Sequence, residues 1–289
     1  MDKSQNRYAD APRNPDFTID QSWSSYTAAE HDRWDRLFRC QQEVLKHRAC
    51  APFLKAVETL QLSEAGIPDM ERLSDRLEKI TGWRVVPVTD LVPDEVFFEH
   101  LANRRFPAGA FIRPEEEFDY LEEPDIFHDI FGHVPLLAVP AYAEFMQAYG
   151  KGGMRALQLD QLQNLARLYW YTIEFGLFRS DEGLRIFGAG ILSSPHESVF
   201  SLEDASPNRV AFDIERIMRT EVIIDDFQQT YFVIDSFEQL LEDCYEDFAD
   251  VYRRVKSLSD IKAEALLETD DVLSRGTLEY FRAKHAHAS

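Results

Sequence analysis

The stretch PDIFHDIFGHVPLL places two histidines inside an apolar run, and it limits what this chain can fold into. His128 and His133 are five positions apart, so an uninterrupted α-helix would separate them by about 140° around its axis. Gly132 and Pro135 disfavour such a helix, because the proline would clash with the carbonyl group four residues before it. We therefore expect a helical turn at His128 and a distorted helix end at His133, which lets the second ring turn back towards the first.

A neutral imidazole is the commonest metal ligand in proteins, but a histidine among apolar residues is more often a core side chain. Glu174, in the apolar segment LYWYTIEFGL, is a candidate third ligand, because carboxylates are rarely buried unless they are paired or bound to a metal. The alternatives for Glu174 are a solvated face or a pair with Arg167 or Arg179. Two histidines and one carboxylate bind iron(II) in non-haem oxygenases, and the same set binds zinc in hydrolases. The residues alone leave both metals open.

The charge and the apolar pattern restrict the class of protein. The chain has 31 basic and 52 acidic residues, a net charge of −21 at pH 7, which disfavours nucleic acid and anionic membranes as partners. No segment approaches the roughly 18 consecutive apolar residues of a membrane-spanning helix, and the first residues lack the apolar core of a signal peptide. The 3 cysteines form no Cys-x-x-Cys pair, so we expect no disulfide framework. These features predict a soluble, cytoplasmic protein.

Helical periodicity dominates the chain. Thr27 and Glu30 form a capping-box pattern that begins a helix, and Gly82 ends another. Further helices are expected at about residues 52–62, 68–81, 93–103, 140–150 (ended by Gly150, Gly152 and Gly153), 157–177 and, capped by Ser236 with Gln239, from residue 237 onwards. The segments WRVVPV, AGAFIR, RIFGAGILSS and TYFVID are expected to be extended.

Strands and helices do not alternate regularly, which disfavours a doubly wound sheet. We expect a mostly α fold with a small β component, of the α+β class. Residues 1–25 are polar and are expected to form a flexible N-terminal extension, while residues 26–289 are expected to form one domain.

The sequence resembles the pterin-dependent aromatic amino acid hydroxylases. The resemblance rests on EPDIFHDIFGHVPLL, YWYTIEFGL, GAGILSS and YFVIDSF, which occur in the order found in the family, and it extends from about residue 27 to about residue 240. It implies a single catalytic domain of this type in which His128, His133 and Glu174 bind iron(II). It also implies tetrahydrobiopterin or another tetrahydropterin as electron donor, with O2 as co-substrate.

The same resemblance implies roles for ten further residues. Those expected to contact the pterin are Leu91, Val92, Phe97, Asp129 and Tyr169. Those expected to bind the substrate are Arg113 and Ser193 at its carboxylate, Trp170 and Phe175 around its ring, and Gly190, where the backbone approaches closely. Two alternatives come from residue type: Phe97 as an ordinary core aromatic, and Arg113 in a surface salt bridge with residues 115–117.

The activity that the resemblance implies is hydroxylation of L-phenylalanine to L-tyrosine. Hydroxylation of tryptophan or tyrosine is the alternative within the family, because the motifs do not decide between the three rings. A zinc hydrolase with the same three ligands is the alternative from another class, and a non-enzymatic acidic binding protein comes last. The C-terminal stretch shows no sustained heptad repeat, so a monomer is expected.

Overall fold

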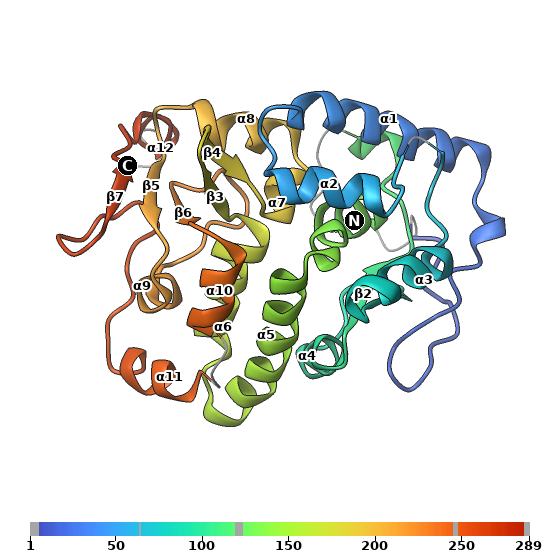
Figure 1. Cartoon of the computed structure of the whole chain (residues 1–289), viewed down its shortest axis with the longest axis horizontal. Coiled ribbons are helices and arrows are strands. Elements are labelled where there is room, and N and C mark those ends of the chain that lie inside the picture. The colour runs from blue at the N-terminus through green and yellow to red at the C-terminus, as the bar shows by residue number, and fades with distance from the viewer. Residues whose placement is uncertain (1–5, 64, 119–123, 245–247, 286–289) are drawn as a thin grey trace.

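The computed structural model describes residues 6–63, 65–118, 124–244 and 248–285. Helices dominate, and the strands form two small sheets (Figure 1). The expected mostly helical fold with a small β component is confirmed. Among the described residues, no helix has both the length and the apolar character needed to cross a bilayer.

The N-terminal helices follow their local sequence signals closely. They are α1 (Ala28–Leu45), α2 (Ala51–Thr59) and α3 (Met70–Thr81). Thr27 and Glu30 form the expected reciprocal capping box before α1. Gly82 ends α3 with a φ of 76°, a left-handed conformation that glycine adopts without steric cost.

A parallel two-stranded sheet follows α3. Its strands are β1 (Arg84–Val88) and β2 (Arg105–Gly109), and α4 (Asp94–Ala102) connects them. The extended segment predicted at AGAFIR, residues 108–113, overlaps β2 only at Ala108 and Gly109, because the strand begins at Arg105, paired with Arg84, and ends at Gly109. Of the extension expected at residues 1–25, residues 1–5 lie outside the described part, and residues 6–25 pack against this body with Tyr8 and Ile19 buried.

The helix α5 (Pro140–Leu159) runs through the middle of the molecule (Figure 1) and is longer than predicted. The end predicted at Gly150 is wrong. A Cβ at Gly150 would collide with the backbone of α4 at Leu101 and Ala102. Gly152 and Gly153 likewise leave room for the rings of Phe248 and Phe98. These glycines therefore allow close packing onto the helix instead of ending it.

The long helix predicted at residues 157–177 is divided in the structure. Asp160, with a φ of 56°, ends α5, and α6 (Leu162–Tyr169) begins two residues later. α6 continues into a π-helix, η6 (Trp170–Glu174). The extended segment predicted at RIFGAGILSS is also partly wrong, because β4 (Gly183–Ile186) is followed by the short helix α7 (Ala189–Leu192).

The second sheet has five strands in the order β4-β3-β6-β5-β7. The strands besides β4 are β3 (Leu177–Ser180), β5 (Asn208–Ala211), β6 (Thr230–Ile234) and β7 (Val272–Ser274). β6 was predicted from TYFVID and pairs in parallel with β3 and β5, whereas β4 and β7 are antiparallel to their neighbours. The remaining α-helices are α8 (Pro195–Glu203), α9 (Ile214–Arg219), α10 (Phe237–Cys244), α11 (Ala249–Val255) and α12 (Glu279–His285). Figure 1 shows this sheet on one side of α5 and α6, and β2 with α3 and α4 on the other.

Stability should depend on the protonation of Glu197, which is buried at the start of α8. Burial raises the pKa of this carboxyl to about 7, although the Tyr231 hydroxyl and the Gln228 amide donate hydrogen bonds to it. An unfolded glutamate has a pKa near 4.3. The stabilisation of the fold by protonated Glu197 is therefore complete below about pH 4.3 and is lost as the pH rises through about 7. Relative to Glu197→Gln, the wild type should lose on the order of 3 kcal/mol between about pH 4 and about pH 8. Urea unfolding of both proteins across this range measures the difference, and parallel pH curves would contradict the assignment.

Candidate metal centre

The two histidines lie on one π-helix, η4 (His128–His133). In a π-helix the hydrogen bonds join residues five apart, so side chains at this spacing lie on the same side. His133 is the last residue of this segment, as expected for a distorted helix end, and a 3₁₀ helix, η5 (Pro135–Ala138), follows. Gly132 packs against Ala189 of α7, where a Cβ would lie 3.0 Å from the Ala189 carbonyl oxygen. The tight contact with α7 therefore fits a glycine at this point of the turn.

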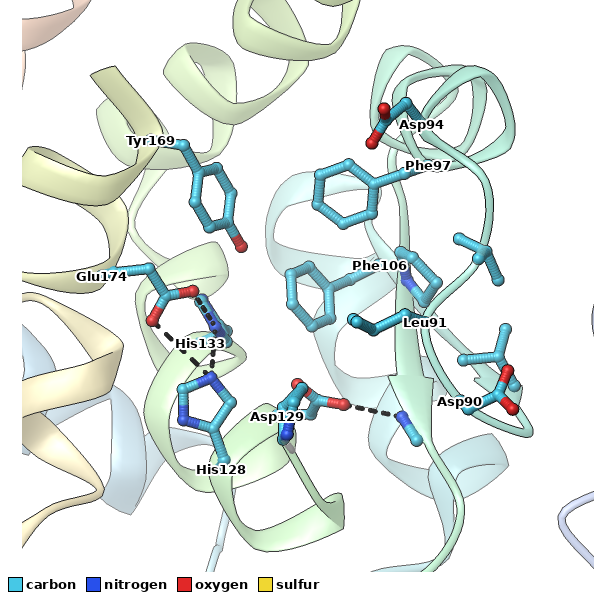
Figure 2. Close-up of a pocket in the computed structure, with 15 residues that line it drawn as sticks. Asp90, Leu91, Asp94, Phe97, Phe106, His128, Asp129, His133, Tyr169 and Glu174 are labelled. Carbon is cyan, nitrogen blue, oxygen red and sulfur yellow. Dashed lines mark hydrogen bonds and ion pairs between the residues drawn. The ribbon is translucent and has the colours of Figure 1, made fainter. Parts of the chain in front are cut away.

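Glu174 is the last residue of the second π-helix, η6, and faces the histidines (Figure 2). Its Oε1 lies 3.1 Å from His133 Nε2, and its Oε2 lies 3.7 Å from His128 Nε2. The two Nε2 atoms are 3.1 Å apart, and one ligand atom from each residue falls within 4.8 Å of the others. The structure thus brings together the three residues that the sequence selected.

Ser193 determines which nitrogen of His128 faces this centre. The Ser193 hydroxyl donates to the Ala189 carbonyl at 2.8 Å, so it accepts a hydrogen bond from His128 Nδ1, 2.9 Å away. A proton on Nδ1 leaves the lone pair of Nε2 directed at Glu174 and His133. A metal-binding histidine usually donates its other ring N–H in this way. Ser193, expected at the substrate carboxylate, therefore also orients a candidate ligand.

The electrostatics of the three groups favour a bound cation. Burial raises the pKa of Glu174, but the two histidines outweigh this effect and hold it at about 2, so the carboxylate is charged. Burial lowers the pKa of His128 to about 4, which keeps this ring neutral. Burial also lowers the pKa of His133, but the adjacent Glu174 carboxylate reverses the effect and the net shift is upward. The site thus offers a neutral imidazole at His128 and a carboxylate at Glu174. His133 attracts a positive charge beside that carboxylate, and a divalent metal ion can take the place of its proton.

Replacing Ser193 with alanine should weaken metal binding about 10- to 100-fold, because His128 Nδ1 loses the partner that fixes its tautomer. The measurement is competition between the protein and a chelator for iron(II). Ser194→Ala is the matched control, because this neighbouring serine caps α8 through the Glu197 amide and should affect only stability. Equal affinities in the two variants would remove Ser193 from this role.

A cavity of about 280 Å³ opens beside the three candidate ligands. All five residues expected to contact a pterin line it: Leu91, Val92, Phe97, Asp129 and Tyr169. Figure 2 shows Tyr169 and Glu174 on one side and Phe97, Phe106 and Leu91 on the other. The rings of Phe97 and Tyr169 are 5.9 Å apart, so Phe97 lies at the cavity and not only in the core. The sequence did not indicate the lining residues Val88, Asp90, Asp94, Phe106, Pro107, Gly109 and Pro124.

Asp129 is the acidic residue of this cavity, next to His128 in the chain. Burial raises its pKa to about 7. Its Oδ2 accepts a hydrogen bond from the Gly109 amide at 2.7 Å, which links η4 to the end of β2. Asp129 thus contributes an acceptor of adjustable charge to the cavity wall.

Arg113 is buried and does not form the surface salt bridge with residues 115–117 that its sequence position allowed. Its guanidinium binds both carboxylate oxygens of Asp125, each at 2.9 Å, and Glu115 pairs instead with Arg33 and Arg36. Asp125 Oδ1 also accepts a hydrogen bond from the His128 backbone amide at 3.0 Å. Asp125 therefore connects Arg113 to the metal-binding turn, a role that the sequence did not indicate.

The other residues expected at the substrate lie around the candidate ligands and not among the residues lining the cavity. The rings of Trp170 and Phe175 are 4.8 Å apart, and Trp170 Nε1 donates to Gln228 at 3.0 Å. A Cβ at Gly190 would lie 3.0 Å from Phe175 Cζ and 3.2 Å from Glu174 Oε2. A side chain at Gly190 would therefore push on Glu174.

Two histidines and one carboxylate that converge beside a cavity form the ligand set of mononuclear iron oxygenases, and comparison with known proteins places the chain in a family of this class. Residues 16–274 match the biopterin-dependent aromatic amino acid hydroxylases, and the chain belongs to this family. The resemblance expected from the four motifs is confirmed, and the zinc hydrolase alternative is excluded. Iron(II) and a tetrahydropterin are the cofactors of this chain.

Individual relatives are similar over nearly the whole chain. The phenylalanine-4-hydroxylase of Caulobacter vibrioides is 58% identical over 269 residues, which cover 93% of this chain and 92% of that protein. The phenylalanine-4-hydroxylase of Ralstonia nicotianae is 55% identical over 265 residues, 92% of this chain and 85% of that one. A crystal structure of Chromobacterium violaceum phenylalanine hydroxylase bound to cobalt superposes with a TM-score of 0.91 at 47% identity, covering 94% of this chain and 98% of that chain.

Proposed function

We propose that this chain hydroxylates L-phenylalanine to L-tyrosine with O2 and a tetrahydropterin at a mononuclear iron(II) site. The observation that supports this most directly is the convergence of His128, His133 and Glu174 beside an open cavity. The high identity to phenylalanine-4-hydroxylases supports phenylalanine as the substrate. Bound together, iron(II) and the tetrahydropterin supply the reductive activation of O2 that no side chain can provide.

The roles proposed for the cavity residues are supported by their positions in the lining. His128, His133 and Glu174 hold the metal through two imidazole nitrogens and a carboxylate. Leu91, Val92, Phe97, Asp129 and Tyr169 hold the pterin: the aromatic rings offer faces for stacking, and Asp129 offers a hydrogen-bond acceptor.

The proposed substrate-binding groups contact the candidate ligands or their neighbours but do not line the cavity. Asp125 occupies two donors of Arg113, and the Arg113 Nη1 contact with the Phe118 carbonyl is long, at 3.4 Å. Nη1 is therefore the donor that we assign to the substrate carboxylate. Trp170 and Phe175 hold the aromatic ring, and Gly190 permits its close approach. Ser193 can donate to the substrate carboxylate only if its hydroxyl turns away from the Ala189 carbonyl.

The test is an assay of purified protein with iron(II), a tetrahydropterin, O2 and each aromatic amino acid in turn. We expect pterin-coupled hydroxylation with the highest kcat/KM for phenylalanine. If kcat/KM is highest for tryptophan or tyrosine, that amino acid replaces phenylalanine as the substrate, and the assignment to the family is unaffected. No coupled hydroxylation of any of the three would overturn the proposal.

Removal of the metal should abolish activity reversibly. After treatment with a chelator and buffer exchange, the protein should regain activity with iron(II) but not with zinc(II), since zinc has no redox chemistry. Full activity in the metal-depleted protein would contradict the assignment of the three ligands.

We further propose that residues 26–289 form one catalytic domain that works as a cytoplasmic monomer. The absence of sustained heptads in the C-terminal stretch supports the monomer. The free thiols at Cys40 and Cys50 support the cytoplasmic location. Sedimentation should give a mass near 33.5 kDa, and cell fractionation should recover the protein with cytoplasmic enzymes. A sedimentation mass near four times this value would contradict the monomer.

A further inference from the structure

The N-terminal segment 6–19 lies along the edge of β1 that β2 does not cover. Thr18 forms an antiparallel bridge with Val88, and the Ile19 amide donates to the Pro87 carbonyl at 2.9 Å. On the opposite edge, the Val88 carbonyl accepts from the Ala110 amide at 3.0 Å. Successive carbonyls at the end of β1 therefore bind the N-terminal segment on one side and the chain after β2 on the other.

Asn6 extends this contact into the loop that follows β1. Its Nδ2 donates to the Thr89 carbonyl at 2.8 Å, and its Oδ1 accepts from the Tyr8 amide at 2.9 Å. The Tyr8 ring is only 5% exposed, and its hydroxyl donates to the Gln21 carbonyl at 2.7 Å. The buried Tyr8 side chain thus anchors the backbone whose amide holds the Asn6 side chain beside the loop. Arg13 adds an exposed ion pair with Asp90 at 3.7 Å.

The loop held in this way forms one wall of the active-site cavity. Val88, Asp90, Leu91 and Val92 all line it, and Figure 2 shows Asp90 and Leu91 across the cavity from the metal ligands. The Leu91 side chain is 77% exposed, so its own packing does little to fix the loop. Val88 and Thr89 are buried, and the hydrogen bonds to the backbone at Pro87 and Thr89 act together with this packing to position the start of the loop.

We propose that segment 6–19 is a positioning element for the pterin-binding wall and that Asn6 is the residue through which it fixes the loop. This inference rests on the proposed function, because it takes a tetrahydropterin as the ligand of the cavity. Asn6 and Arg13 precede the part of the chain that matches the family, which begins at residue 16. Asn6 is a positioning residue and touches neither the metal ligands nor the substrate residues.

Asn6→Asp tests this contact with little change in shape. A carboxylate still accepts the hydrogen bond from the Tyr8 amide but has no donor for the Thr89 carbonyl. Asn14→Asp is the matched control, because it makes the same charge change in the same segment. Asn14 Nδ2 bonds only within the segment, to Thr18 Oγ1 at 2.9 Å.

Three readouts are compared in the iron-loaded proteins. They are the dissociation constant of a tetrahydropterin by anaerobic calorimetry, amide hydrogen exchange in peptides covering residues 84–93, and the separate KM values for pterin and phenylalanine. Loss of one hydrogen bond should weaken pterin binding and raise its KM about two- to tenfold. Exchange in residues 84–93 should accelerate. The value of kcat and the KM for phenylalanine should change less than about twofold, and Asn14→Asp should behave as the wild type.

Unchanged pterin binding in Asn6→Asp, or an equal rise in both KM values, would overturn the inference. An equal effect of Asn14→Asp would also overturn it, because a charge effect would then explain the change. Failure of the proposed function looks different: the wild type itself would then bind no tetrahydropterin and show no coupled hydroxylation.

Discussion

Replacing Glu174 with glutamine should leave a folded protein that no longer retains iron(II). The amide keeps the size of the side chain but removes the charge that faces His133 at 3.1 Å and His128 at 3.7 Å. Partners that merely orient a ligand already contribute about 10- to 100-fold to metal affinity, so loss of a ligand itself should exceed about 100-fold. Iron content per chain after gel filtration, together with hydroxylation activity, measures this result.

Glu197→Gln is the matched control for this variant. It makes the same change at a second glutamate, which is buried and whose partners are Tyr231 and Gln228. This control should bind iron(II) as the wild type does. Wild-type iron content and activity in Glu174→Gln would remove Glu174 from the site.

Replacing Arg113 with methionine should destabilise the protein by about 3–5 kcal/mol, because it leaves the fully buried Asp125 carboxylate without its partner. In the folded protein, burial raises the pKa of Asp125, but Arg113 reverses the effect and holds it below its ordinary value. Urea unfolding measures the loss. The partly exposed Arg36, which pairs with Asp32 and Glu115, is the control, and its replacement by methionine should cost less than about 1 kcal/mol.

The double variant Arg113→Met/Asp125→Asn separates stability from substrate binding. An asparagine at position 125 carries no charge and can still accept from the His128 amide, so much of the stability should return. The KM for phenylalanine should remain raised, because the guanidinium assigned to the substrate carboxylate is absent. Recovery of a wild-type KM in the double variant would remove Arg113 from the substrate site.

The sequence predicts those elements of this fold whose signals are local. The capping box at Thr27, the left-handed Gly82 and the apolar strand β6 all depend on neighbouring residues, and all three agree with the structure. Gly150 fails as a helix end because its role depends on α4, some fifty positions earlier in the chain, whose backbone it contacts. Local propensity carries no information on such a distant contact.

The same distinction applies to the site. Residue type and the family resemblance suggest His128, His133 and Glu174, but the π-helical winding that brings the histidines together forms against α7, which nothing in the stretch itself specifies. For Arg113, the salt bridge expected from sequence proximity is wrong, because its nearest acidic neighbours, residues 115–117, are not its partners. Asp125, twelve positions away, reaches it only after the chain turns back.

The π-helix η4 has a consequence for how the metal centre responds to changes in the core. His128 and His133 are five positions apart and face the metal side, while Phe127 and Phe131 are four apart and stack in the core with ring centroids 4.9 Å apart. Phe131 also meets Phe38 of α1 and Phe53 of α2 edge-on. One short π-helix therefore carries both the candidate metal ligands and part of the aromatic core, and a change of volume at Phe131 would be expected to shift the backbone that positions His128 and His133.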